Sequence, residues 1–273
     1  FLAIAMYFIW PVFNMVINGF GTLLSVAGAF GTFIYGFLER LLIPTGLHHI
    51  LNQLIRFTPI GGTAMIDGEQ ISGALNIYNQ LLMSSNPDMD VMRQATRFLT
   101  QGTHPFMVFG LPAACYAMYK TAYPKNREKV KGILLAAGLT SFFTGITEPI
   151  EFAFFFISPL LWIFHAFMAG LSFLINTLLG VCIGNAGGGL VDLVLFGVFR
   201  GSETKWLLNV AIGLVYAVIY FLVFRWALTK INIKTPGRED EPDAISYSDD
   251  VTDLGYSILS DLGGKDNIHE IDN

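Results

Sequence analysis

The sequence predicts an all-α integral membrane protein built as a bundle of several spanning helices. Of its 273 residues, 53% are hydrophobic and only 14% are charged, whereas an average soluble domain has about 25% charged residues. The mean hydropathy is +0.55. Residues 132–183 carry only two formal charges, Glu148 and Glu151. No short alternating strand pattern recurs, so the spans are expected to be helical.

The apolar segments that predict these helices differ in length. In chain order they cover residues 1–27, 30–54, 105–119, 132–143, 152–183 and 206–228. The second is interrupted by Glu39 and Arg40 and again by Pro44. A straight span needs about 20 apolar residues, and several of these segments are shorter or carry Gly, Pro or charge. Polar backbone at membrane depth survives only when it is buried in protein or lines a cavity, so we expect re-entrant hairpins as well as complete spans.

A long polar stretch, residues 59–101, separates the second apolar segment from the third. Within it, Asn86, Pro87 and Asp88 form a typical start signal for a helix. We therefore expect a short helix over residues 88–99 in a segment that otherwise reads as a loop.

Basic residues gather in two segments that flank apolar ones. Residues 120–131 hold five Lys and Arg residues against a single acid, Glu128. Residues 225–238 hold four basic residues at the end of the last apolar segment. Loops rich in Lys and Arg remain on the cytoplasmic side of a membrane. Both segments are therefore expected on that side.

The first cluster of polar residues lies in the interrupted second segment. Arg40, Pro44 and His48 are four residues apart, so they share one face if the segment is helical. Arg40 and His48 would then offer hydrogen-bond donors from one wall of a cavity, with Glu39 and His49 beside them. The alternative is a local role, in which Arg40 pairs with Glu39 or lies at the membrane interface, and His48 is a satisfied interior histidine.

The second cluster, Thr147, Glu148 and Glu151, lies inside the longest apolar stretch. A carboxylate at membrane depth costs about 2.5–3.5 kcal/mol on insertion scales and usually faces a cavity or a partner. Pro149 removes a backbone N–H and disfavours helix at Glu148, so we expect a broken segment there. An ionised carboxylate can accept two hydroxyl hydrogens or shuttle a proton. Alternatively both glutamates neutralise Arg40 or accept hairpin N–H groups, a structural role that suits Glu151 better.

A third polar group directly precedes the third apolar segment. Residues 100–105, which include His104, are polar and turn-forming. They either close one side of a pocket or simply begin a helix. Residues 185–192 form another polar turn with Asp192 at its end. His165 lies in an aromatic-rich span, where we expect it to be structural.

No pattern in the sequence points to a metal ion or a cofactor. Cys115 and Cys182 both lie in apolar segments, so we expect them to be buried free thiols. Neither zinc-ligand spacing nor a Gly-rich phosphate loop is present. We therefore expect no metal, no cofactor and no nucleic-acid partner, and we expect the lipid bilayer to surround the protein.

Two of these segments resemble a known family. Residues 36–49 and 145–152 resemble the signature segments of the enzyme II C component (EIIC) of the glucose superfamily. This component belongs to the bacterial phosphoenolpyruvate-dependent sugar phosphotransferase system. The resemblance extends over residues 31–273, with its motifs in family order. Within the superfamily, residues 57–63 and the stretch to His104 are most similar to the maltose and glucose members.

The resemblance implies a division into domains. Residues 1–28 would be the end of a scaffold domain with the dimer interface, and residues 29–234 a transport domain with two re-entrant hairpins. Residues 235–261 would be a cytoplasmic linker, and residues 262–273 the truncated start of a B domain. Residues 234–240 resemble the family's linker, and residues 263–273 resemble the opening of its B domain. The B domain's phosphorylated cysteine would follow Asn273. We therefore expect a fragment that lacks the first spans and does not phosphorylate sugar unaided.

The resemblance also implies a function and partners. It implies a homodimeric, multi-pass carrier of the bacterial inner membrane with a cytoplasmic C-terminal tail. The carrier would bind glucose or an α-glucoside such as maltose and present it to a B domain that is phosphorylated through the A component, as part of a phosphohistidine–sugar phosphotransferase. The implied sugar ligands are Arg40, His48 and Glu148, supported by Glu39, His49, Thr147, Glu151 and His104.

Two other functions fit the polar clusters. In a proton-coupled secondary sugar carrier, Glu148 or Glu151 would titrate during transport. In a membrane scaffold without a substrate, the intramembrane charges would only pair with one another. The tail that resembles a B domain favours the phosphotransferase interpretation over both. The energy source distinguishes the two carriers, because an uncoupler stops only the proton-driven one.

Overall fold

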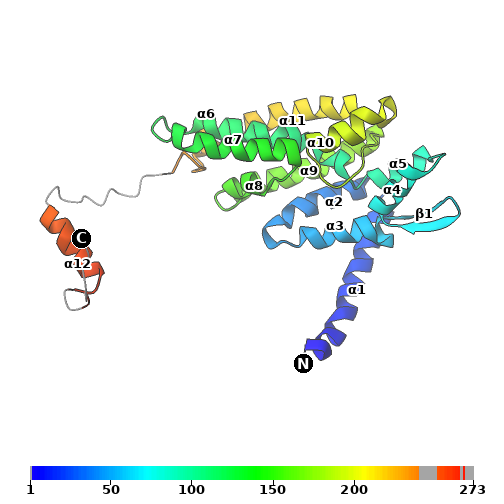
Figure 1. Ribbon diagram of the computed structural model, residues 1–273, viewed down its shortest axis with the longest axis horizontal. Coiled ribbons are helices and arrows are strands. Elements are labelled where there is room, and N and C mark those ends of the chain that lie inside the picture. Colours follow the sequence, from blue (N-terminus) through cyan, green and yellow to red (C-terminus); the bar gives the residue numbers. More distant parts are fainter. Residues whose placement is uncertain (1, 240–250, 265–266, 268–273) are drawn as a thin grey trace. The chain divides into compact units, whose positions relative to one another are not determined.

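The computed structural model describes residues 2–239, 251–264 and 267, and this part of the chain is mostly helical (Figure 1). The α-helices are α1 (Leu2–Val26), α2 (Ala29–Leu41), α3 (His48–Phe57), α4 (Ala74–Met83), α5 (Met89–Thr96), α6 (Leu111–Thr121), α7 (Arg127–Thr144), α8 (Glu148–Phe155), α9 (Pro159–Leu179), α10 (Leu190–Asp192), α11 (Trp206–Trp226) and α12 (Val251–Asp261). Wider π-helical turns lead into α6 and follow α11, at Pro105–Gly110 and Ala227–Ile231. The helical fold class expected from the sequence is confirmed.

Helix lengths separate complete spans from shorter elements. Among the described residues, Pro159–Leu179 and Trp206–Ile231 are long and apolar enough to cross a membrane. By contrast, α3 has 10 residues and α8 has 8, so they are about 15 and 12 Å long. A hydrocarbon core is about 30 Å thick. If the two long helices cross the membrane, α3 and α8 are too short to cross the hydrocarbon core beside them.

Small residues set the close packing of α2 along α9. A Cβ placed at Gly36 of α2 would overlap the ring of Phe173 on α9, and one at Gly170 would overlap the backbone of Phe33. Small residues at a helix interface let the two backbones approach each other. This packing brings the last turn of α2, with Arg40, alongside the helix that carries His165.

The polar stretch of residues 59–101 contains more regular structure than its sequence predicted. The short helix is confirmed as α5, because the Asp88 side chain accepts the N–H groups of Asp90 and Val91 at 2.8 and 3.2 Å. The expectation of a loop before it is wrong, because α4 and the hairpin of β1 (Thr63–Ile66) and β2 (Glu69–Ser72) precede α5. Asp67 and Gly68 both have positive φ, 50° and 87°, and Asp-Gly is a strong hairpin signal.

The chain divides into two units, Phe1–Arg238 and Glu239–Asn273. The segment expected to be a solvated linker, residues 235–261, differs from that expectation at both ends. Thr235 and Arg238 are buried in the first unit, and residues 251–261 form α12 in the second. Arg238 is held because its Nη1 donates to the backbone oxygen of Thr121 at 2.7 Å.

Two other domain predictions stay predictions. The first unit includes both sides of the expected boundary between residues 28 and 29, and α1 packs on α2 across it. The expected start of a B domain, residues 262–273, falls largely outside the described residues, since only 262–264 and 267 are described.

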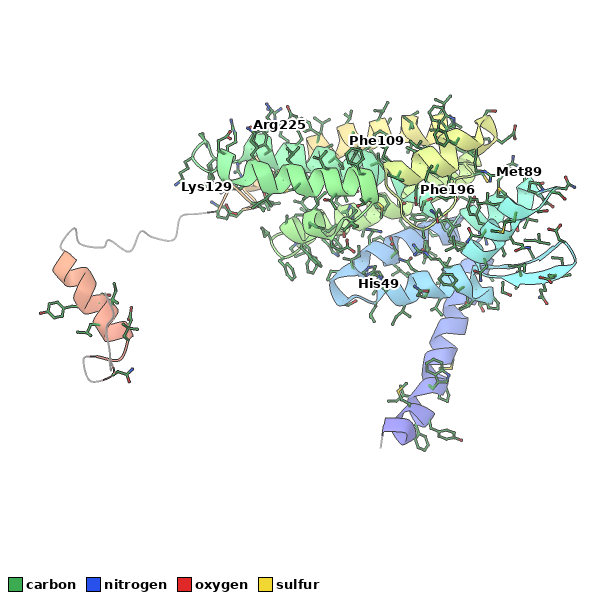
Figure 2. All side chains as sticks on the ribbon, in the orientation of Figure 1. His49, Met89, Phe109, Lys129, Phe196 and Arg225 are labelled. Carbon is green, nitrogen blue, oxygen red and sulfur yellow. The ribbon has the colours of Figure 1, made fainter. Side chains whose placement is uncertain are left out.

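The two basic segments lie against each other at one end of α6, α7 and α11. The Tyr123 N–H donates to the Gly237 oxygen at 2.9 Å, and the Arg238 guanidinium lies 5.1 Å from the centre of the Tyr123 ring. Lys129 and Arg225, labelled in Figure 2, lie at this same end. The two segments must therefore be on the same side of a membrane.

This arrangement predicts the outcome of cysteine labelling in intact cells. A membrane-impermeant thiol reagent should miss cysteines placed at Lys125 and Lys234 until the cells are opened, because basic loops stay cytoplasmic. Ser202 is the matched control, since it is exposed just before α11, whose 21 residues place it about 31 Å from the basic end. Ser202→Cys should react from outside. Labelling of Lys125→Cys or Lys234→Cys from outside would contradict the topology. The native Cys115 and Cys182 are buried, so the background is low.

Candidate functional site

A polar cavity of about 180 Å³ lies where four segments of the first unit meet. Four of its walls are the last turns of α2, the turn between α7 and α8, and the loops that precede α6 and α10, and one face of α3 closes it. Its polar lining comprises Tyr35, Glu39, Arg40, His48, His49, Asn52, Arg56, Thr100, Thr103, Thr147 and Glu148. Phe98, Phe173 and Met107 add apolar surface. Residues 107 positions apart in the sequence, such as Arg40 and Thr147, therefore share one site.

Arg40 is at the centre of a buried ionic cluster. Its Nε and Nη2 donate to the two oxygens of Glu39, both at 2.7 Å. Its Nη1 donates to Glu151 Oε1 at 2.9 Å and to Thr147 Oγ1 at 3.0 Å. Arg40, Glu39 and Glu151 are 3%, 4% and 0% exposed. The guanidinium thus joins the end of α2 to the start of α8, and most of its N–H groups are already engaged.

The two glutamates of the second cluster have different environments. Glu151 is fully buried and does not line the cavity; its Oε1 also contacts Nε2 of His165 at 2.9 Å. Glu148 is only partly buried and does line the cavity. One of its oxygens, Oε2, accepts the Thr147 N–H at 3.0 Å. The arrangement leaves Glu148 as the carboxylate that faces the cavity and makes Glu151 a partner of Arg40.

The expectation that Arg40, Pro44 and His48 share a helical face is wrong. Helix α2 ends at Leu41, residues 43–45 form a 3-10 turn, and Gly46 is left-handed with φ of 74°. Helix α3 then begins at His48 and runs in a new direction. Arg40 and His48 nevertheless both line the cavity, because the turn folds α3 back beside α2.

His48 is 7% exposed, and its Nδ1 has no hydrogen-bond partner among the described residues. His49, labelled in Figure 2, is exposed, and its ring centre lies 4.0 Å from that of His48. Because exposed His49 also lines the cavity, the cavity reaches the surface there. His48 offers a free ring nitrogen to a ligand, and His49 lies at the entrance.

Sequence patterns alone missed three polar residues of the site. Two of them, Asn52 and Arg56, follow His48 at intervals of four. One face of α3 therefore presents His48, Asn52 and Arg56 to the cavity. Tyr35 donates to Asn52 Oδ1 at 2.6 Å, and Arg56 Nη2 donates to the backbone oxygen of Ala186 at 3.3 Å. The spacing of four from His48 was the signal that identifies this face.

The third polar group only partly fulfils its expected role. Thr100 and Thr103 line the cavity, whereas His104 does not. His104 is fully buried, and neither ring nitrogen has a partner among the described residues. The structure therefore does not bring His104 to the cavity wall, and its supporting role stays a prediction. The turn of residues 185–192 does contribute, because Asp192 accepts the Gly187 N–H at 2.7 Å and holds that backbone at the cavity wall.

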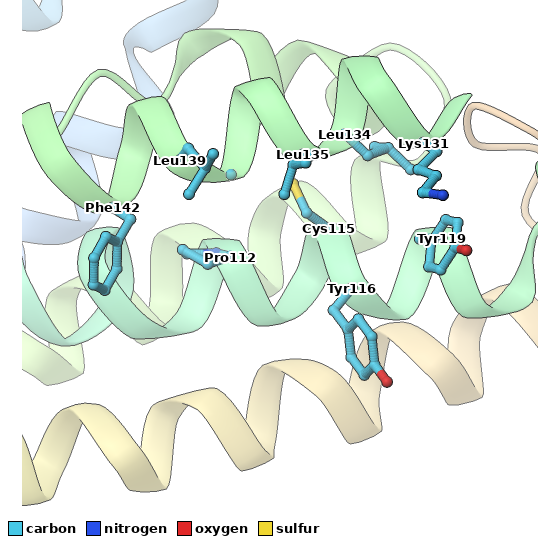
Figure 3. A pocket seen from close by; sticks show the side chains of 10 residues that line it. Pro112, Cys115, Tyr116, Tyr119, Lys131, Leu134, Leu135, Leu139 and Phe142 are labelled. Atoms are coloured by element: carbon cyan, nitrogen blue, oxygen red, sulfur yellow. The ribbon is translucent and has the colours of Figure 1, made fainter. Parts of the chain in front are cut away.

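The donors and acceptors of the cavity suit a neutral, hydroxyl-rich ligand. No group of three or more His, Cys, Asp or Glu residues in the described ranges is placed to hold a metal ion. One larger hollow, about 480 Å³, lies beside Lys120 and Arg225 and has no carboxylate among the described residues of its lining. Another, about 430 Å³ between α6 and α7, is lined mainly by apolar side chains such as Leu135, Leu139 and Phe142 (Figure 3). It offers few partners to hydroxyl groups, so the polar cavity is the candidate site.

Comparisons with known proteins identify the family of this chain. Residues 1–170 match the family described as phosphotransferase system, EIIC. The chain is 44% identical over 272 residues to the PTS system maltose-specific EIICB component of Escherichia coli (strain K12). That alignment covers 97% of this chain and 51% of the relative. The chain therefore spans about half the length of the curated relative that it matches.

Proposed function

This chain belongs to the EIIC family of the phosphotransferase system, and from that premise we propose that it is a sugar-translocating membrane subunit. It binds a sugar in the polar cavity and presents it for phosphorylation. The observation that carries the proposal is the meeting of Arg40, His48 and Glu148 around one cavity between two turns. An ionised carboxylate accepts two hydroxyl hydrogens, while histidine and asparagine side chains supply both donors and acceptors.

The size of the cavity supports glucose or an α-glucoside as the ligand. A cavity of about 150 Å³ holds a benzene-sized molecule, so about 180 Å³ accommodates one sugar ring. The relative's name specifies maltose, which has two rings. On this proposal one glucosyl ring lies against Glu148 and His48, and a second ring, where present, extends past His49 toward the opening.

Several finer features form part of the proposal. The short helices α3 and α8 are limbs of two re-entrant hairpins whose turns carry the polar clusters to membrane depth. The protein is a homodimer in the bacterial inner membrane, with the basic end and the C-terminal tail in the cytoplasm. A B domain, phosphorylated through the A component, delivers phosphate to the bound sugar. The chain is thus part of a sugar phosphotransferase.

Equilibrium binding of maltose, glucose and N-acetylglucosamine to the purified chain tests the proposal. We expect saturable binding of glucose or maltose and weaker binding of N-acetylglucosamine, because its bulkier 2-substituent meets a cavity sized for one ring. Binding of none of the three would overturn the proposal. Uptake by cells that carry the complete system should require phosphoenolpyruvate and survive an uncoupler. Loss of uptake with the uncoupler alone would instead establish a proton-driven carrier.

A further inference from the structure

His165 lies outside the cavity, yet it contacts the ionic cluster directly. It is fully buried, in the second turn of α9. Its Nε2 lies 2.9 Å from Glu151 Oε1, and its Nδ1 lies 2.8 Å from the hydroxyl of Tyr220 on α11. Tyr220 is also fully buried. A buried, fully hydrogen-bonded histidine between two helices can fix its neighbours in a single arrangement.

When the imidazole of His165 is neutral, only one assignment of donor and acceptor satisfies both of its hydrogen bonds. Glu151 contacts the Arg40 guanidinium, so its carboxylate is ionised and only accepts hydrogen bonds. Nε2 of His165 must therefore carry the proton and donate. Nδ1 is then the acceptor, and the Tyr220 O–H donates to it. The hydrogen bonds run in one sense from Tyr220 through His165 to Glu151.

Beyond Glu151 the same network reaches the cavity wall. Arg40 Nη1 donates to Glu151 Oε1 at 2.9 Å and to Thr147 Oγ1 at 3.0 Å. Thr147 in turn donates its N–H to Glu148, at 3.0 Å. Four hydrogen bonds thus connect α11, α9, α8 and α2 to the turn that holds the cavity-facing carboxylate.

We propose that His165 and Tyr220 are positioning residues for the sugar site, which act by orienting Glu151 and, through it, Arg40 and the Thr147–Glu148 turn. This inference rests on the proposed function. Aromatic rings of Phe106, Phe154 and Trp162 surround His165, with centres 5.6 to 5.9 Å from the imidazole. Apolar rings packed this closely disfavour a water molecule in place of the imidazole.

A double-mutant cycle between His165 and Glu151 tests the proposal. We expect His165→Leu to weaken maltose or glucose binding by about tenfold, because it removes a hydrogen bond to a charged group. In a Glu151→Leu background the same change should alter affinity by less than about twofold, since leucine cannot accept the His165 N–H and a residue that acts only through Glu151 loses its effect there. His165→Gln, which keeps an N–H donor, should restore most of the affinity. Tyr220→Phe should have a smaller effect than His165→Leu.

The matched control is Tyr216→Phe, because Tyr216 is also buried on α11 but its hydroxyl donates to the backbone oxygen of Met168, at 2.9 Å, and not to His165. It should leave sugar affinity unchanged. Thermal unfolding of each variant identifies any that fail to fold. If His165→Leu does not fold, His165→Gln and Tyr220→Phe still test the proposal. If the wild-type chain binds sugar, the positioning role is overturned when His165→Leu changes affinity equally in both backgrounds or does not change it at all. Absence of binding by the wild-type chain would overturn the proposed function itself.

Discussion

Glu148→Gln is expected to lower sugar affinity by roughly tenfold to a hundredfold, because a hydrogen bond to a charged group contributes about 1.5–3 kcal/mol. Glu148 lines the cavity, and one of its oxygens already accepts the Thr147 N–H. On the proposed function, the other oxygen accepts a sugar hydroxyl. Glutamine keeps the shape of the side chain but removes the charge and replaces one acceptor with a donor.

Calorimetric titration of the purified protein with maltose or glucose measures this change. Glu128→Gln is a suitable control, because Glu128 is an exposed acid whose contact is with Lys131, at 3.3 Å. It should bind sugar like the wild type. Glu151→Gln should have a smaller effect than Glu148→Gln, because Glu151 reaches the cavity only through Arg40. Wild-type affinity in Glu148→Gln would exclude Glu148 as a sugar ligand, and equal losses in the two variants would contradict their ranking.

Most charged residues of the site, Arg56 excepted, could be predicted from the sequence, because charge at membrane depth is costly and therefore informative. Glu148 and Arg40 stand out in apolar segments and do line the cavity. Both glutamates are in the first turn of α8, but only Glu148 lines the cavity, and their separate roles toward a sugar stay predictions. What the sequence did not show was that Arg40 would contact Glu39 and Glu151 together.

The uncharged residues of the site were harder to predict. Tyr35 and Asn52 are polar residues of ordinary helices, and only the turn at Gly46 brings them together at the cavity. His165 was expected to be structural because an isolated histidine in an aromatic span has no visible partner in the sequence. Its partners, Glu151 and Tyr220, are 14 and 55 residues away. Such contacts depend on the packing of whole helices, which local patterns do not specify.

Arg40→Met is expected to cause a larger loss of stability than either Glu148→Gln or His165→Leu. It leaves Glu39 and Glu151 buried without the cation that contacts both. Removing one partner of a buried ion pair typically costs about 3–5 kcal/mol, because an uncompensated charge remains. We expect a clearly lower unfolding temperature in detergent, together with loss of sugar binding.

Two further variants separate charge from geometry at this position. Arg40→Lys keeps the charge but not the planar fork that contacts both glutamates and Thr147, so it should be more stable than Arg40→Met and still bind sugar weakly. Arg40→Met combined with Glu39→Gln and Glu151→Gln should recover much of the stability, because no buried charge is then left unpaired. It should not recover binding, because the Thr147–Glu148 turn loses the guanidinium that holds it.

Arg93→Met provides the comparison for an exposed ion pair. Arg93 contacts Asp90 at 2.8 Å with side chains 35% and 84% exposed, and such pairs contribute about 0–1 kcal/mol. Its unfolding temperature should remain close to that of the wild type. If Arg40→Met also unfolded at the wild-type temperature, the ionic cluster would not join α2 to α8, and the carboxylates of Glu39 and Glu151 would have to be neutral without Arg40. Three results together would assign both roles to the Arg40 guanidinium. Arg40→Met should be unstable, the triple variant should be stable, and only the wild type should bind sugar tightly. The guanidinium would then both stabilise the fold and shape the site.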